Sequence, residues 1–239
     1  MAKEVKLKVK LLSYTKQPQK TVTAAIRQCY SSAGADQLLK NTSKDKQKKL
    51  ISLVTSSGHT STIEHASFTF AIEGISRACS HQLVRHRIAS FSQQSQRYVD
   101  LSKKEMTYII PPEISYSDKK RKEFGQAMEE VEAVYKKLVK VGIKPEDARF
   151  VLPNACETKL VLTMNARSLT NFFRLRTCRR AQWEIRALAK EMMRLVKKTA
   201  PLLFANVGPS CQTEKICWEG EMSCGLYKKI PGAKLKSRK

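Results

Sequence analysis

The chain has little glycine, nine residues in 239, and it contains neither G-x-G-x-x-G nor G-x-x-x-x-G-K-[ST]. Those patterns hold phosphates on glycine-rich backbone at the start of a helix. A phosphate site in this chain therefore has to be built from side chains. Long uninterrupted apolar runs are also missing, which predicts no membrane-spanning helix and no membrane partner.

Acidic residues are scarce beside basic ones, with 21 Asp and Glu against 45 Lys and Arg and a formal net charge of +24. Such charge suits nucleic acid or phosphorylated small molecules. Single-strand binders interleave basic and aromatic side chains, whereas aromatic residues make up only 7% here. We therefore expect no specific nucleic-acid partner. A basic nucleic-acid-binding module is kept as the alternative function because of the net charge.

Signatures of a metal site and of a protein nucleophile are missing. All four histidines lie between residues 59 and 86 without an H-E-x-x-H pattern, so no metal ligand is assigned. Seven cysteines without a secretory signal predict free thiols in a cytoplasmic protein. Cys211, Cys217 and Cys224 follow no common zinc spacing, and both a metal or redox role and incidental cysteines stay open.

Arginine is concentrated where lysine is absent. The segment 77–97 carries four arginines, two histidines and no Lys, Asp or Glu. A guanidinium offers a planar fork of donors to phosphates and flat polar rings, whereas an ammonium is a solvated point charge. Twelve of the fifteen arginines lie in 77–97 and 149–194. The arginines therefore predict anion sites, and the lysine runs predict a basic surface.

Apolar periodicity predicts an α+β fold, a single domain in which helices pack on a mixed or antiparallel sheet. The expected strands are 5–11, 66–73, 108–110 and 159–163. The expected helices are 19–31, 44–56, 76–86, 117–141, 166–177 and 182–199, with a short one from Pro145. Residues 89–97 show neither a helical nor a strand periodicity of apolar residues and are interpreted as an ordered loop.

One ordered set of motifs is specific. Arg85-His86-Arg87 is followed, after seven residues, by Ser95-x-Arg97-Tyr98. The accompanying blocks are His59-x4-Glu64-His65, Phe68-Thr69-Phe70, Glu146-x2-Arg149, Asn165-Ala166-Arg167-Ser168-Leu169, Asn171-Phe172, Leu175-Arg176 and Ala181-Gln182-Trp183-Glu184. Over roughly residues 55–200, their order and spacing resemble those of the flavin-dependent thymidylate synthases.

The resemblance implies reductive methylation of dUMP to dTMP. In that family 5,10-methylenetetrahydrofolate donates the carbon and leaves as tetrahydrofolate, and FAD is the cofactor, reduced by NADPH. A homotetramer with shared active sites is implied as well. The synthase domain is assigned to residues 1–205, and 206–239 to a basic, cysteine-containing C-terminal tail. The phosphates and carboxylates of these ligands agree with arginine-rich segments.

The resemblance also implies roles for single residues. The expected FAD contacts are Ser61, Glu64, Arg85, His86, Arg87, Gln93, Asn165, Arg167 and Asn171. The expected dUMP contacts are Gln82, Arg85, Gln93, Ser95, Gln96, Arg97, Arg149 and Arg176, with Arg149 and Arg176 from another subunit. His59 is placed at the folate or flavin edge. Gln93 and Gln96 stand where Glu and Gly are frequent in the family, so their contacts stay open.

Arg176 is the expected catalytic residue. A permanently charged guanidinium beside N3 and O2 of uracil favours the N3-deprotonated, nucleophilic ring. Ser95 is interpreted as a hydrogen-bond donor to the dUMP phosphate, because a serine nucleophile needs a base and the motif offers none. Other arginines are interpreted as helix-surface or interface charges: Arg77, Arg174, Arg179 and Arg186.

Overall fold

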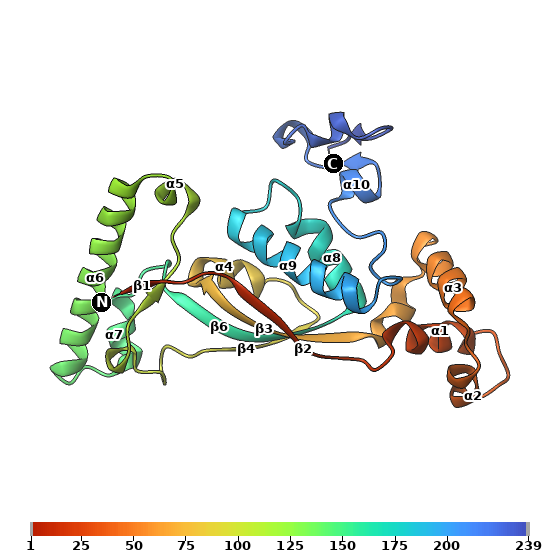
Figure 1. Ribbon diagram of the computed structural model, residues 1–239, viewed down its shortest axis with the longest axis horizontal. Helices are drawn as coiled ribbons and strands as arrows, with labels where there is room; N and C mark the ends of the chain where they lie inside the picture. The colour runs from red at the N-terminus through yellow and green to blue at the C-terminus, as the bar shows by residue number, and fades with distance from the viewer. Residues whose placement is uncertain (1, 238–239) are drawn as a thin grey trace. The chain divides into compact units, whose positions relative to one another are not determined.

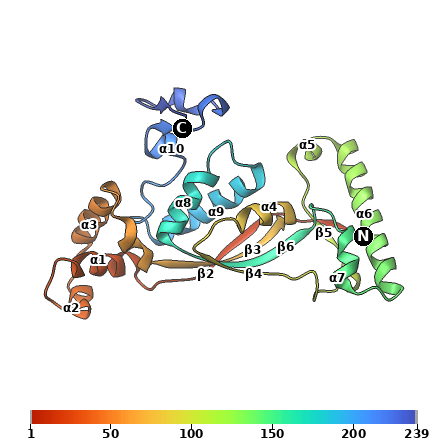
Figure 2. The same cartoon turned by 180° about the vertical axis from the view of Figure 1, so that it is seen from behind.

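The computed structural model describes residues 2–237. Its contacts divide the chain into two compact units, and each is described by itself. The first unit comprises Met1–Val9, Ala71–Arg85 and Phe91–Val161, and the second comprises Lys10–Phe70, His86–Ser90 and Leu162–Lys239. Figures 1 and 2 show the helices and strands from opposite sides.

A four-stranded sheet has the order β2-β3-β6-β4 (Figure 1). Its strands are β2 Lys8–Tyr14, β3 Ser67–Ser76, β6 Glu157–Asn165 and β4 Ala89–Gln93. Two contacts show that β3 and β6 run antiparallel. The Ala66 carbonyl accepts from Ala166 N at 2.7 Å, and Gly74 N donates to Glu157 Oε1 at 2.8 Å. Helices together with an antiparallel sheet confirm the α+β class.

Strand β3 shows the alternation that the sequence predicts. Phe68, Phe70 and Ile72 have no exposed surface, while the residues between them are half-buried. Gly74 has a φ of 69°, and a Cβ at this position would collide with the Lys6 carbonyl. Glycine is therefore required where β3 passes close to the N-terminal segment.

Most helices of the second unit match the predicted ranges. They are α1 Pro18–Gln28, α2 Ala35–Lys40, α3 Lys44–Ser56, the 3-10 helix η1 Thr60–His65, α8 Ala166–Arg176 and α9 Trp183–Thr199. Phe172 and Phe173 of α8, with Ile185 and Leu188 of α9, are fully buried and form its core. The sequence does not predict α2, because Leu38 is the only buried residue of this short helix.

The first unit is built around its longest helix. Its elements are β1 Lys3–Glu4, α4 Arg77–Leu83, the 3-10 helix η2 Leu101–Lys103, β5 Thr107–Tyr108, α5 Pro112–Ser115, α6 Asp118–Lys140, α7 Pro145–Ala148 and the 3-10 helix η3 Arg149–Val151. Strands β1 and β5 pair in parallel. The buried cluster beneath α6 contains Met106, Tyr108, Met128 and Cys156. Helix α6 confirms the prediction over 117–141, beginning after the Ser117 cap and ending before Gly142, whose φ is 93°.

Three predictions about local structure were wrong. Residues 89–93 form the strand β4 rather than a loop, because backbone pairing with β6 replaces the missing apolar alternation, and Gln94 N donates to Lys159 O at 2.9 Å. Helix α4 ends at Leu83, and Ile88 has a φ of 61°, so the Arg85–Arg87 motif lies in a turn. The expected N-terminal strand is split into β1 and β2.

The region expected to be a C-terminal tail carries secondary structure within its described part. It contains α10 Ser210–Thr213, β7 Ile216–Cys217, the 3-10 helices η4 Gly220–Met222 and η5 Leu226–Lys229, and β8 Lys234–Leu235. Strands β7 and β8 pair in parallel. The last two tail residues lie outside the described residues. Across residues 2–237, every helix is too short or too polar to cross a membrane.

Candidate active site

Helix α4 and the segment after α7 line an open cavity of about 320 Å³ in the first unit. Ser76 caps α4 by accepting from Cys79 N at 3.0 Å. Arg77 and His81 lie one turn apart on this helix and both line the cavity. The other lining residues are Gln96, Arg149, Phe150, Leu152, Pro153 and Asn154.

The cavity has the electrostatics of an anion site. Arg77 and Arg149 are both half-buried. Burial lowers the pKa of Arg77, and the neighbouring charge of Arg149 lowers it further. Two guanidiniums that repel each other in a partly desolvated space are stabilised by a bound phosphate or carboxylate. Arg77, interpreted from the sequence as a helix-surface or interface charge, thus lines this cavity from α4.

Hydrogen bonds order the segment that follows β4. Gln93 Nε2 donates to Ser80 Oγ and to Thr158 Oγ1, both at 3.0 Å, which uses both amide hydrogens inside the protein. Ser95 Oγ accepts from Arg97 N at 3.1 Å. The Ser95 hydroxyl therefore keeps its own hydrogen available to a ligand, as a donor role requires.

A second arrangement joins two predicted residues in the second unit. Arg176 Nε, at the end of α8, donates to His86 Nε2 at 2.8 Å. Burial lowers the pKa of His86 to about 4, and the Arg176 charge adds to the shift. His86 is therefore neutral at pH 7 with its proton on Nδ1, and its ring packs edge-on against Phe172 at 4.8 Å. A neutral imidazole orients the guanidinium without cancelling its charge.

The expected FAD residues on α8 and η1 are close to one another. Arg167 Nη1 donates to Glu64 Oε1 at 2.6 Å, and both side chains are exposed. Asn165 caps α8 by accepting from Ser168 N at 2.8 Å, which is a structural task beside any ligand contact. Asn171 is exposed one turn after Arg167 and lies on the same helix face.

His59 and Ser61 line a different cavity of the second unit, with a volume of about 700 Å³. Apolar side chains of Leu50, Leu53 and Val54 contribute to its wall, and Arg27 and Lys46 supply positive charge. A cavity of this size that is apolar with a few charged groups suits an organic ligand.

The structure gathers some predicted residues and separates others. Of the expected dUMP contacts, only Gln96 and Arg149 line the Arg77 cavity. Gln82, Arg85, Gln93, Ser95 and Arg97 belong to the same unit without lining it, whereas Arg176 belongs to the second unit. Sequence reasoning missed Arg77 and His81 as lining residues, and their four-residue spacing on a helix was the available signal.

Comparisons with known proteins give the family. The family model described as "Thymidylate synthase complementing protein" matches residues 10–202. A "Flavin-dependent thymidylate synthase" from Clostridium tetani is 52% identical over 93% of this chain and 95% of the relative. Another so named, from Geobacter sulfurreducens, is 53% identical over 92% of this chain and 94% of the relative.

A solved structure shares the fold. It is a UMP/dUMP methylase from Streptomyces cacaoi bound with 5-Br dUMP, with a TM-score of 0.73 and 24% sequence identity over 85% of this chain and 95% of that chain. The ordered motifs, the family model and relatives at about half identity agree. The chain therefore belongs to the flavin-dependent thymidylate synthase family and is an enzyme of that family.

Proposed function

We propose that the chain methylates dUMP to dTMP, with 5,10-methylenetetrahydrofolate as carbon donor, FAD as cofactor and NADPH as reductant. The cavity that Arg77 and Arg149 share carries this proposal, because two half-buried guanidiniums in one cavity fit a nucleotide phosphate. The family's activity and the dUMP analogue in the Streptomyces methylase support the same substrate.

The dUMP site in this proposal combines charged and neutral groups. Arg77 and Arg149 neutralise the phosphate, and Gln96 adds an amide at the same cavity. The Ser95 hydroxyl donates a hydrogen bond to the phosphate, because its oxygen already accepts from Arg97 N. The remaining contacts are assigned to Gln82, Arg85, Gln93 and Arg97.

We assign FAD to exposed groups on η1 and α8, together with Arg85 and Arg87. Arg85 and Arg87 are exposed, so their guanidiniums are accessible to a pyrophosphate. Ser61, Glu64, His86, Gln93, Asn165, Arg167 and Asn171 complete the proposed contacts. Bound FAD supplies the redox chemistry, while the protein binds, orients and excludes water.

Arg176 acts on the uracil ring in this proposal. Its guanidinium stabilises negative charge at O2 and N3, which makes the ring a better carbon nucleophile. His86 accepts the Arg176 Nε hydrogen, so the remaining donors of the guanidinium can face the substrate. His59 is proposed at the folate or flavin edge, beside the 700 Å³ cavity.

The assembly is proposed to be a cytoplasmic homotetramer in which Arg176 acts in a neighbouring subunit's site. Arg149 serves the site of its own chain, because it shares a cavity with Arg77 and Gln96. Mixing inactive Arg176→Ala protein with a protein inactivated at Arg149 tests the sharing of sites. Restored activity in mixed oligomers is expected if the two residues serve one site from different subunits. Activity that stays absent despite demonstrated subunit exchange contradicts the shared site.

The direct test of function is dTMP formation from dUMP with methylenetetrahydrofolate and NADPH, with and without FAD. We expect turnover that requires all four compounds. A protein that takes up no FAD and forms no dTMP, yet binds nucleic acid with a steep salt dependence, would instead favour the nucleic-acid-binding alternative.

A separate variant tests the flavin site. Arg87→Ala is expected to weaken FAD binding about tenfold, because one exposed charge-assisted contact to the pyrophosphate is lost. A titration of flavin fluorescence measures the change. Arg194→Ala is the control, since Arg194 is an exposed arginine of α9 that pairs with Glu191; equal affinities of the two variants contradict the assignment of Arg87.

A further inference from the structure

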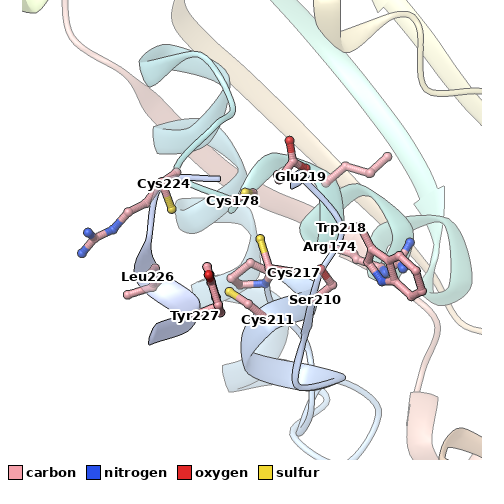
Figure 3. Close-up of a pocket in the computed structure, with 13 residues that line it drawn as sticks. Arg174, Cys178, Ser210, Cys211, Cys217, Trp218, Glu219, Cys224, Leu226 and Tyr227 are labelled. Atoms are coloured by element: carbon pink, nitrogen blue, oxygen red, sulfur yellow. The ribbon is translucent and has the colours of Figure 1, made fainter. Parts of the chain in front are cut away.

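Four cysteines of the second unit line one small cavity (Figure 3). Cys178 follows α8, Cys211 lies in α10, Cys217 ends β7 and Cys224 follows η4. Figure 3 shows their sulfur atoms gathered from these separate segments. The cavity volume is about 40 Å³, which leaves room for an ion or a water molecule and none for a nucleotide or flavin.

The four thiols affect one another electrostatically. Burial raises the pKa of Cys211, and the neighbouring Cys217, Cys178 and Cys224 raise it further. The pKa of Cys178 is raised by burial, and then by Glu219, Cys224 and Cys217 against one backbone hydrogen bond that lowers it. The thiolate forms would repel each other, and a cation among them removes that repulsion.

The C-terminal segment has little else to stabilise it. In the described stretch 211–237, Cys211 and Cys217 are the only buried residues. Its helices and strands are two to four residues long. Segments with so small a core usually need a covalent or metal cross-link to hold one conformation. The two buried residues are themselves members of the thiol cluster.

The thiols are not arranged as a finished coordination sphere. Within residues 2–237, no three His, Cys, Asp or Glu side chains form a group that could hold a metal ion as placed. All four cysteines are free thiols. Rotation about χ1 moves a cysteine sulfur between three staggered positions, so short side chains that already line one cavity can close on an ion.

We propose that Cys178, Cys211, Cys217 and Cys224 bind one zinc ion that ties the C-terminal segment to the end of α8. Four S–H bonds break, four Zn–S bonds form and the protons pass to solvent. Thiolates select soft metals, and four cysteines fill the tetrahedral shell of zinc, which makes the site structural. This site is independent of the proposed nucleotide chemistry.

A disulfide among the same cysteines is the less favoured chemistry. A disulfide joins two of the four cysteines and leaves the other thiols of the cavity unused, whereas one zinc ion takes all four. A disulfide also needs an oxidant, whereas zinc binding needs only the ion. The two outcomes differ in mass and in metal content, so one experiment separates them.

Elemental analysis of the purified full-length protein is the first test. We expect one zinc ion per chain, and we expect Cys217→Ser and Cys224→Ser to reduce the metal to the level of chelator-treated protein. Cys29→Ser is the matched control, because Cys29 is a free, exposed cysteine outside this cavity. Zinc that survives both cavity substitutions overturns the proposal.

A titration of wild-type protein covers the case in which the variants fail to fold. Protein stripped with a chelator is titrated with Co²⁺ while thiolate-to-cobalt absorption is followed. Saturation at one equivalent and a thermal midpoint that rises when zinc is restored are the expected results. Absence of cobalt absorption, or an intact mass that reveals a disulfide among these cysteines, overturns the proposal.

Discussion

Arginines of the two units have different kinds of neighbours. In the first unit, Arg77 and Arg149 share a cavity, where the charge of Arg149 acts on Arg77 and Arg149 Nε donates to a backbone carbonyl. In the second unit, Arg176 is fixed by a neutral histidine and Arg167 by Glu64. The first arrangement places two positive charges beside one cavity, and the second fixes the direction of a guanidinium.

The two arrangements have different energetic consequences. Burial and then the charge of Arg149 lower the pKa of Arg77, and a bound anion would offset both effects. A neutral acceptor leaves the whole charge of Arg176 for its ligand, which a carboxylate partner would partly cancel. In the proposed function, the first unit's pair therefore binds the phosphate, and the second unit's pair orients a guanidinium.

The largest effect is expected at Arg176. Arg176→Ala should lower kcat for dTMP formation by about 100-fold to 1,000-fold or more, the usual loss when one preorganised donor to developing charge is removed. FAD content, read from the absorption spectrum, should stay unchanged. Arg176→Lys keeps the charge without the planar fork, and its full activity would contradict a role for the fork.

A smaller loss is expected at the first unit's pair. Arg77→Ala and Arg149→Ala should each raise KM for dUMP roughly 10-fold to 100-fold, because a charge-assisted hydrogen bond contributes about 1.5–3 kcal/mol. Arg121→Ala is the control, since Arg121 lies in the same unit and pairs with Glu4. If KM changes no more in the cavity variants than in Arg121→Ala, the cavity is not the phosphate site.

The neutral state of His86 predicts a pH dependence of stability. Its pKa falls from 6.5 to about 4 on folding, so the unfolded chain binds the extra proton between these values and the folded chain does not. The free energy of unfolding should therefore decrease as pH falls from about 6.5 to about 4, by up to about 3 kcal/mol.

His86→Gln tests whether His86 causes this pH dependence of the unfolding free energy. Glutamine offers an acceptor to Arg176 and does not titrate, so urea unfolding of the variant should show a flatter pH dependence across the same window. An equally steep dependence in His86→Gln would show that another group controls it. Wild-type protein whose stability is constant over this window would contradict the buried neutral histidine.

The sequence predicted the parts of the structure that periodicity or ordered motifs encode. Phe68, Phe70 and Ile72 alternate, and their strand was predicted over 66–73, which ends three residues before the observed end at Ser76. Strand β4 was missed because its stability comes from pairing with β6, which is a contact between distant segments. The proximity of Arg77 to Arg149 was missed for the same reason, since the two residues lie far apart in the chain. The cluster of Cys178 with Cys211 also depends on tertiary contacts that spacing does not encode.

The smallest effect is expected at Glu146. Its substitution tests whether the Glu146 carboxylate positions the arginines of the first unit. Glu146 Oε2 pairs with Arg97 at 3.0 Å, and the side chains of Arg97 and Glu146 are 52% and 38% exposed. The backbone carbonyl of Glu146 accepts from Arg149 Nε at 2.9 Å. Glu146→Gln removes the ion pair and keeps the carbonyl, so unfolding free energy should change by less than about 1 kcal/mol. KM for dUMP should change by less than about threefold, because Arg149 keeps its backbone partner. A rise in KM equal to that of Arg149→Ala would mean that the ion pair of Arg97 with Glu146 positions the phosphate site. The first unit would then orient an arginine through a carboxylate, as Glu64 orients Arg167 in the second unit.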